Sequence, residues 1–91
     1  MSRFKRGKTQ YRSMAMKVHA VMWREDDMYV IKDVYTGVTT QGRTPEEARK
    51  NLKEALELYF EEFPELQREY AQIVKRGLRY GTIEVAPQPI G

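Results

Sequence analysis

Thr44-Pro45-Glu46-Glu47 opens the stretch of sequence that decides the fold. Thr44 is expected at the N-cap of a helix, Pro45 at the first helical position and Glu47 at the third, which is a capping box. In this arrangement the Thr44 hydroxyl accepts a hydrogen bond from the amide of Glu47. The Glu47 carboxylate reaches back to the amide of the N-cap residue. The sequence therefore predicts a helix that begins here, with both glutamates at the positive end of its dipole.

Apolar residues recur at helical spacing after this start and fill one stripe about 100° wide. They are Ala48, Leu52, Ala55, Leu56, Tyr59 and Phe63. This pattern predicts a helix that packs on a sheet and exposes its other side. Leu58 and Phe60 fall on the two flanks of the stripe, where they either extend the core or form a protein contact. Pro64 breaks the helix near Phe63 and opens a second one over residues 64–76, with Gly77 at the C′ position.

Three short strands are predicted before the first helix and one after the second. The first spans Met16 to Trp23, and its two apolar faces favour a strand that is central or covered on both sides. A polar turn leads to a second strand, Met28 to Asp33, and the short connection favours an antiparallel pair. Val38 to Gln41 is the third strand, and Tyr80 to Ala86 is the last. The fold class is therefore α+β, an antiparallel three-stranded meander with one or two helices on the sheet and a final strand.

The charge of the chain is divided unevenly. Five basic residues and no acidic ones precede Met14, while the rest of the chain has 11 basic and 13 acidic residues. The basic residues of this arm are Arg3, Lys5, Arg6, Lys8 and Arg12. Residues 1–15 are thus expected to be a disordered basic arm, residues 16–86 a domain, and residues 87–91 a short tail. Such an arm is either a solvated terminus or a binder of nucleic acid phosphates.

The residues that usually carry catalysis are sparse. The chain has no cysteine and one histidine, His19, which sits in the first predicted strand without a second imidazole to share a metal. Asp26 and Asp27 lie in a turn and Asp33 at a strand end, which favours structural roles. No glycine-rich loop has phosphate-binding spacing. We therefore expect no enzyme activity, no metal and no cofactor. The absence of cysteine, of a secretory signal and of an apolar run of about 18 residues favours a cytoplasmic protein that does not cross a membrane.

The segment from Val38 to Tyr59 resembles the HicB-like antitoxin family. The matching residues are Val38-Thr39-Thr40-Gln41-Gly42-Arg43-Thr44-Pro45-Glu46-Glu47-Ala48, then Asn51-Leu52-Lys53-Glu54-Ala55-Leu56-Glu57-Leu58-Tyr59, with Tyr29-Val30 in the second strand. The resemblance covers roughly Met16 to Glu62 and then Tyr80 to Val85. It implies a partial ribonuclease-H-like fold without catalytic acids, a tendency to form homodimers or larger assemblies, and a HicA-type toxin as partner. Two features depart from the family. Residues 33–38 replace its proline-rich segment, and the chain is expected to be a stand-alone member without a C-terminal DNA-binding domain.

Two functions are open at this point. The resemblance implies a non-catalytic module that binds and neutralises a HicA-type mRNA interferase, a small basic protein that the acidic helices would attract. The residues expected to contact it are Tyr35, Thr36, Leu58, Phe60 and Glu61. The alternative is a small nucleic-acid-binding protein that uses the basic arm and aromatic side chains such as Tyr11, Trp23 and Tyr35. In either case the exposed edge of the third strand favours self-association.

Overall fold

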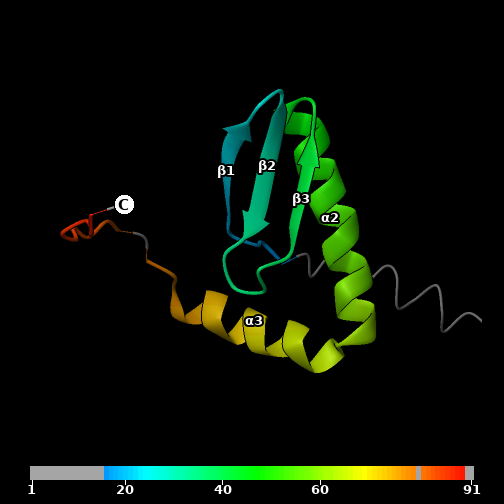
Figure 1. Ribbon diagram of the computed structural model, residues 1–91. Helices are drawn as coiled ribbons and strands as arrows, with labels where there is room; N and C mark the ends of the chain where they lie inside the picture. Colours follow the sequence, from blue (N-terminus) through cyan, green and yellow to red (C-terminus); the bar gives the residue numbers. More distant parts are fainter. Residues whose placement is uncertain (1–15, 80, 90–91) are drawn as a thin grey trace, which may run out of the picture.

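The computed structural model describes residues 16–79 and 81–89. It consists of a three-stranded sheet in the order β1-β2-β3, a long helix α2 along one face, and a second helix α3 beneath one end of the sheet (Figure 1). The predicted α+β class and the antiparallel meander are confirmed.

The sheet is built from β1 (Ala20–Glu25), β2 (Met28–Asp33) and β3 (Thr39–Gly42). β1 and β2 form a hairpin in which Glu25 lies opposite Met28, so the turn consists of Asp26 and Asp27. Asp26 has a φ of 55°, a backbone conformation that aspartate tolerates better than most residues. β2 is central, and β3 pairs with its other edge in antiparallel register.

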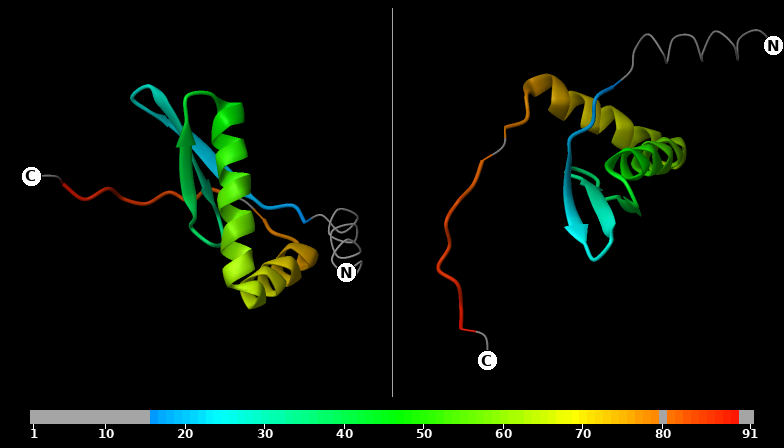
Figure 2. Two further views of the ribbon diagram at one scale, coloured as in Figure 1. Left: turned by 90° about the vertical axis from the view of Figure 1, so that its right-hand side faces the viewer. Right: turned by 90° about the horizontal axis from the view of Figure 1, so that it is seen from above.

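β1 is an edge strand, which corrects the prediction that it is central or covered on both sides. Val21 and Trp23 point to the face opposite α2 and remain 47% and 39% exposed. No helix of the described chain covers this face, as the two views of Figure 2 show. The strand also begins four residues later than predicted, at Ala20. The apolar alternation of its sequence therefore indicates a strand but not its place in the sheet.

α2 spans Pro45–Glu62, and the capping box that predicted its start is present. The Thr44 hydroxyl accepts from the amide of Glu47 at 3.0 Å. The Glu47 carboxylate accepts from the amide of Arg43 at 2.6 Å, one residue before the position predicted. Both bonds satisfy backbone donors at the helix entrance, which have no partner inside the helix.

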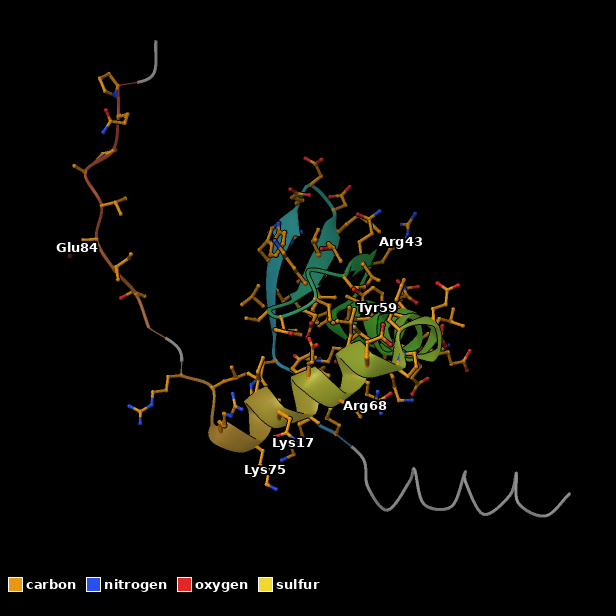
Figure 3. The ribbon with its side chains drawn as sticks, turned by 90° about the horizontal axis from the view of Figure 1, so that it is seen from below. Lys17, Arg43, Tyr59, Arg68, Lys75 and Glu84 are labelled. Carbon is orange, nitrogen blue, oxygen red and sulfur yellow. The ribbon has the colours of Figure 1, made fainter. Side chains whose placement is uncertain are left out.

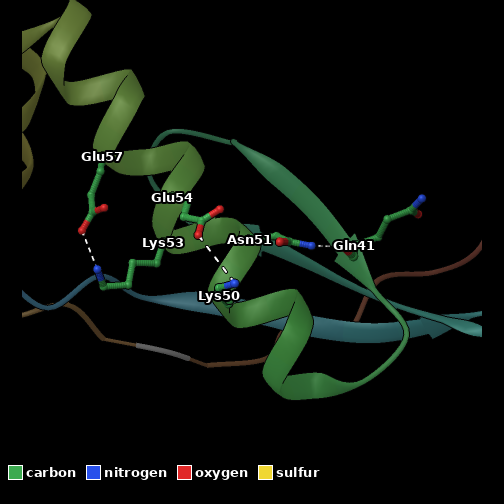
Figure 4. A network of polar contacts seen from close by, with 6 residues as sticks. All are labelled: Gln41, Lys50, Asn51, Lys53, Glu54 and Glu57. Atoms are coloured by element: carbon green, nitrogen blue, oxygen red, sulfur yellow. Dashed lines mark hydrogen bonds and ion pairs between the residues drawn. The ribbon is translucent and has the colours of Figure 1, made fainter.

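Polar contacts also hold α2 against β3 (Figure 4). The side-chain amide of Asn51 donates to the carbonyl of Gln41 at 2.9 Å, and the Thr40 hydroxyl donates to the carbonyl of Ala48 at 3.2 Å. Gly42 allows the close approach, because a Cβ there would lie 2.6 Å from the backbone nitrogen of Ala48. The exposed side of the helix carries the ion pairs Lys50–Glu54 and Lys53–Glu57.

The core lies between the sheet and the two helices. Its buried residues are Ile31, Ala48, Leu52, Leu56, Phe60 and Tyr70. The apolar stripe of α2 thus runs in steps of four residues and ends on Phe60, whereas Phe63 is 40% exposed. This corrects the predicted stripe, in which Phe63 was inside and Phe60 on the flank. Phe60 is buried because the Tyr70 ring of α3 packs edge-on against it, with 6.2 Å between ring centroids.

α3 spans Pro64–Arg76, as predicted, and Gly77 ends it with a φ of 96°. The Gly77 amide donates to the carbonyls of Ile73 and Val74. Tyr80 lies outside the described residues, and the rest of the strand predicted over residues 80–86 is not formed, since residues 81–89 have no secondary structure and extend away from the sheet (Figures 1 and 2). A strand needs a hydrogen-bonding neighbour, and this segment has none within the described chain.

Candidate partner-binding surface

The junction of α2 and α3 exposes apolar side chains among carboxylates. We call this the corner surface, and it consists of Leu58, Glu61, Glu62, Phe63 and Glu65, all of them exposed. Leu58 is 65% exposed and Phe63 40%. Because exposed apolar groups beside charges are typical of contact surfaces, this region is the strongest candidate for a binding site.

Local backbone geometry holds the corner surface in place. Phe63 ends α2 with a φ of −129° and a ψ of 69°, and its amide donates to the carbonyl of Tyr59 at 2.9 Å. Pro64 then opens α3. The ring of Tyr59 lies 5.2 Å from the ring of Phe63 and 5.8 Å from that of Phe60. The ring of Phe63 therefore packs on Tyr59, which also contacts Phe60 of the core.

The corner surface is electrostatically one-sided. Its charged residues are Glu61, Glu62 and Glu65, and the next basic residue along the chain is Arg68. The last turn of α2 likewise contains no basic residue, although the negative end of the helix dipole favours cations there. Glu65 lies in the first turn of α3, where a carboxylate is favourable. A positively charged surface is the natural complement of this arrangement.

Tyr35 borders the acidic side of α3. Its ring lies 5.0 Å from the ring of Tyr70, and its hydroxyl donates to the carboxylate of Glu69 at 3.2 Å. Loss of solvent around the phenol raises the pKa of Tyr35 above its ordinary value of 10.0, and the hydrogen bond and negative charge of Glu69 raise it further. The ring is still 39% exposed, so Tyr35 is available for contact.

Residues 9–74 match the family described as "Family of unknown function (DUF7387)". The chain belongs to this family. The match includes the whole sheet, α2 and most of α3, and it ends before the extended residues 81–89. No curated protein and no solved structure matches the chain.

The other predicted contact residues of this DUF7387 protein lie in three different parts of the chain: the corner surface, the core and the turn after β2. Leu58 and Glu61 belong to the corner surface, but Phe60 is 8% exposed and belongs to the core, which corrects its prediction as a contact residue. The amide and hydroxyl of Thr36 both donate to the Asp33 carboxylate at 2.7 Å, so Thr36 stabilises the turn after β2. The five basic residues predicted to hold nucleic acid lie in residues 1–15, outside the described part of the chain.

A buried polar cluster joins the sheet to α3. Asp33 and Tyr70 are both 0% exposed, and the Tyr70 hydroxyl donates to the Asp33 carboxylate at 2.5 Å. The same hydroxyl accepts from the amide of His19 at 2.9 Å. Asp33 thus has a structural role, as its position at a strand end predicts.

The aspartates of the DUF7387 chain do not converge. Asp26 and Asp27 precede β2 and Asp33 ends it, so the length of a six-residue strand, about 17–20 Å, separates them. Within residues 16–79 and 81–89 no three histidine or acidic side chains gather in a way that could hold a metal ion. None of the helices in this part of the chain is long and apolar enough to cross a membrane.

A groove between β1 and α2 is the feature that sequence reasoning missed. It has a volume of about 360 Å³ and an apolar floor formed by Val18, Ala20, Met22, Ile31, Leu52 and Leu56. Arg49 and Lys53 line it from the side of α2. The alternation of Val18, Ala20 and Met22 predicts one apolar face of a strand, but it does not show that this face stays partly open beside α2.

Proposed function

We propose that the chain is a non-catalytic protein-interaction module that binds and neutralises a basic mRNA interferase of the HicA type. The observation that supports this is the corner surface, where Leu58 and Phe63 are exposed close in the chain to three carboxylates, those of Glu61, Glu62 and Glu65. The HicB-like sequence pattern from Val38 to Tyr59 supplies the class of partner.

The two kinds of side chain have different tasks in this proposal. Leu58 and Phe63 lose water on binding and supply affinity, because apolar groups that become buried contribute most of the energy of a contact. Glu61, Glu62 and Glu65 draw a positively charged protein toward the surface and orient it. Neutralisation follows from occlusion, since a toxin held by its basic, RNA-facing side cannot take up messenger RNA.

A direct binding and inhibition assay tests the proposal. A HicA-type protein from the same genome is purified, and its cleavage of RNA is measured with increasing amounts of the chain. We expect stoichiometric inhibition by the native chain. The double variant L58E/E61K should weaken inhibition at least tenfold, because it removes an apolar contact and reverses one charge.

The control is Glu25→Lys, which repeats the Glu-to-Lys reversal of E61K at the end of the hairpin, opposite the α2–α3 junction in Figure 1. This variant should inhibit like the native chain. If E25K and L58E/E61K reduced inhibition equally, the effect would be one of overall charge, and the corner surface would not be the binding site. A chain that leaves cleavage unchanged would overturn the proposal itself. Binding to RNA that disappears with residues 1–13 would establish the nucleic-acid function instead.

A further inference from the structure

Among residues 16–79 and 81–89, no strand lies beside the outer edge of β1. In the sheet β1 pairs with β2 alone. The amide of Val34 donates to the carbonyl of His19, so His19 and every second residue after it direct their backbone groups toward β2. Alternate residues of β1, namely Ala20, Met22 and Arg24, therefore direct their backbone N–H and C=O groups away from β2. This edge is a row of hydrogen-bonding groups that a further strand can use.

The groove described above adjoins this edge. Ala20 and Met22 belong to both, since their backbone groups form the edge and their side chains line the groove. A strand added beside β1 would place every second side chain over the apolar floor between β1 and α2. The groove therefore selects a strand with apolar residues at alternate positions.

Residues 81–86 of the same chain have this pattern. Ile83 and Val85 alternate with Thr82 and Glu84, and they are 86% and 74% exposed. Glu84 is the sole charged side chain from Gly81 to Gly91. Pro87 ends the segment, because proline has no amide hydrogen to donate to a neighbouring strand. The exposed segment is thus as long as β1, which has six residues.

The path of the chain after α3 places residues 81–89 away from the groove of their own domain. The amide of Gly77 closes the end of α3, and Tyr70 ties this helix to Asp33 and to the start of β1. From there residues 81–89 pass beyond β1 and extend away from the sheet in Figure 1 and in the right-hand view of Figure 2. Glu84 stands well clear of the other labelled side chains (Figure 3). The segment lies as an extended arm outside its own domain.

We propose that residues 81–86 add to the β1 edge of a second copy of the chain, with Ile83 and Val85 in its groove. If the exchange is reciprocal, two copies related by a twofold axis each receive the arm of the other, and the assembly closes as a dimer. The arrangement extends each sheet to four strands and covers the free edge of β1. It does not involve the corner surface, so it stands independently of the toxin-binding proposal.

Light scattering of the purified full chain tests the assembly. We expect the mass of a dimer. The double variant I83K/V85K places two charges in the groove and should shift the chain to a monomer, with a dissociation constant raised at least a hundredfold. The matched control is T82K/A86K, which adds the same charge on the opposite face of the strand and should remain a dimer. A monomeric native chain, or a dimer that I83K/V85K preserves, overturns the proposal.

Chemical cross-linking identifies the source of the strand. The native chain has no cysteine, so the double variant V21C/E84C carries only two thiols, one on β1 and one on the arm. A short bis-maleimide should join them between copies and yield a covalent dimer. In the control T39C/E84C the first thiol lies on β3, at the far edge of the sheet, and the yield of dimer should be low. A link formed within single chains would show that the arm folds back on its own β1, and this result also overturns the proposal.

Discussion

The hydroxyl of Tyr70 and the carboxylate of Asp33 meet at 2.5 Å in the interior, where neither side chain is exposed to solvent. Tyr70 comes from α3 and Asp33 from the end of β2, so the contact links elements that are 37 residues apart in the chain. Asp33 also accepts from Thr36, and Tyr70 also accepts from the amide of His19. One buried carboxylate therefore organises the turn after β2, the start of β1 and the position of α3.

Tyr70→Phe should destabilise the chain. It removes only the hydroxyl, which leaves the buried carboxylate and the His19 amide each without one hydrogen-bond partner, and the expected loss is about 1–3 kcal/mol. Urea denaturation measures the change in the free energy of unfolding. Tyr35→Phe is the matched control, because it removes a surface hydrogen bond to Glu69 and should change stability by less than about 0.5 kcal/mol. Equal effects of the two variants would contradict a structural role for the buried pair.

Gly42→Ala should destabilise the contact between β3 and α2. The new Cβ would lie 2.6 Å from the backbone nitrogen of Ala48 and 2.9 Å from backbone and side-chain carbons of Glu47. The helix must shift to admit it, at a cost of about 1–3 kcal/mol. Gly81→Ala serves as the control, since nothing lies within 4 Å of its Cβ. Thermal unfolding of both variants should show a lowered melting temperature for Gly42→Ala alone.

Thr44→Ala should weaken the start of α2. The variant loses the acceptor for the amide of Glu47, and such caps typically contribute about 0.5–2 kcal/mol. Thr44→Ser keeps the hydroxyl and should retain most of the stability. The two free energies of unfolding, measured by urea denaturation, give the comparison. If the serine variant were as unstable as the alanine variant, the cap would not be the cause.

Phe60 and Leu58 are near neighbours in α2 with opposite expected effects. Phe60→Ala empties a core position and should cost about 3–5 kcal/mol. Leu58→Ala removes a side chain that is 65% exposed and should change stability by less than about 0.5 kcal/mol. Chemical denaturation separates the two. A large loss for Leu58→Ala would show that this residue is covered within the chain, and the corner surface would lose its apolar centre.

Tyr35 should ionise above its ordinary pKa of 10.0. Folding favours the protonated phenol, so this contribution to stability is complete below the pKa of the unfolded chain and is lost as the pH rises through the higher pKa of the folded one. Glu69→Gln removes the negative charge that contributes to the shift and should lower the pKa of Tyr35. Glu65→Gln, one turn earlier in α3, should leave it unchanged. NMR titration of the Tyr35 ring provides the measurement, and a pKa that does not respond to Glu69→Gln would contradict the contact.

The starts and ends of both helices were predictable because their signals are local. The Thr44 cap, Pro64 and Gly77 act within one turn of chain, and the structure has helices over Pro45–Glu62 and Pro64–Arg76. The choice between Phe60 and Phe63 as the buried aromatic was not predictable from helical spacing. It depends on where Tyr70 returns from α3, which is a tertiary contact. Of the contact residues, Leu58 and Glu61 lie on the surface, as a flank position and an acidic run suggest.

Whether residues 81–86 pair with a neighbouring strand cannot be predicted from their apolar alternation. The pattern of Ile83 and Val85 indicates that the segment suits a strand, but it does not say which edge accepts it. Within the described chain the segment pairs with nothing, and the edge and groove of β1 stay open. The groove was missed for the same reason, since the first strand was expected to be covered.

The acidic residues in the final turn of α2 lower the stability of that helix. Glu61 and Glu62 stand at the negative end of the helix dipole with no basic side chain in that turn to offset them. The negative end of the helix dipole repels each of these carboxylates. A cationic protein bound at this place removes the repulsion at the same time as it makes its contacts. Binding and helix stability are therefore linked, and the complex should resist unfolding by more than its interface contacts alone supply.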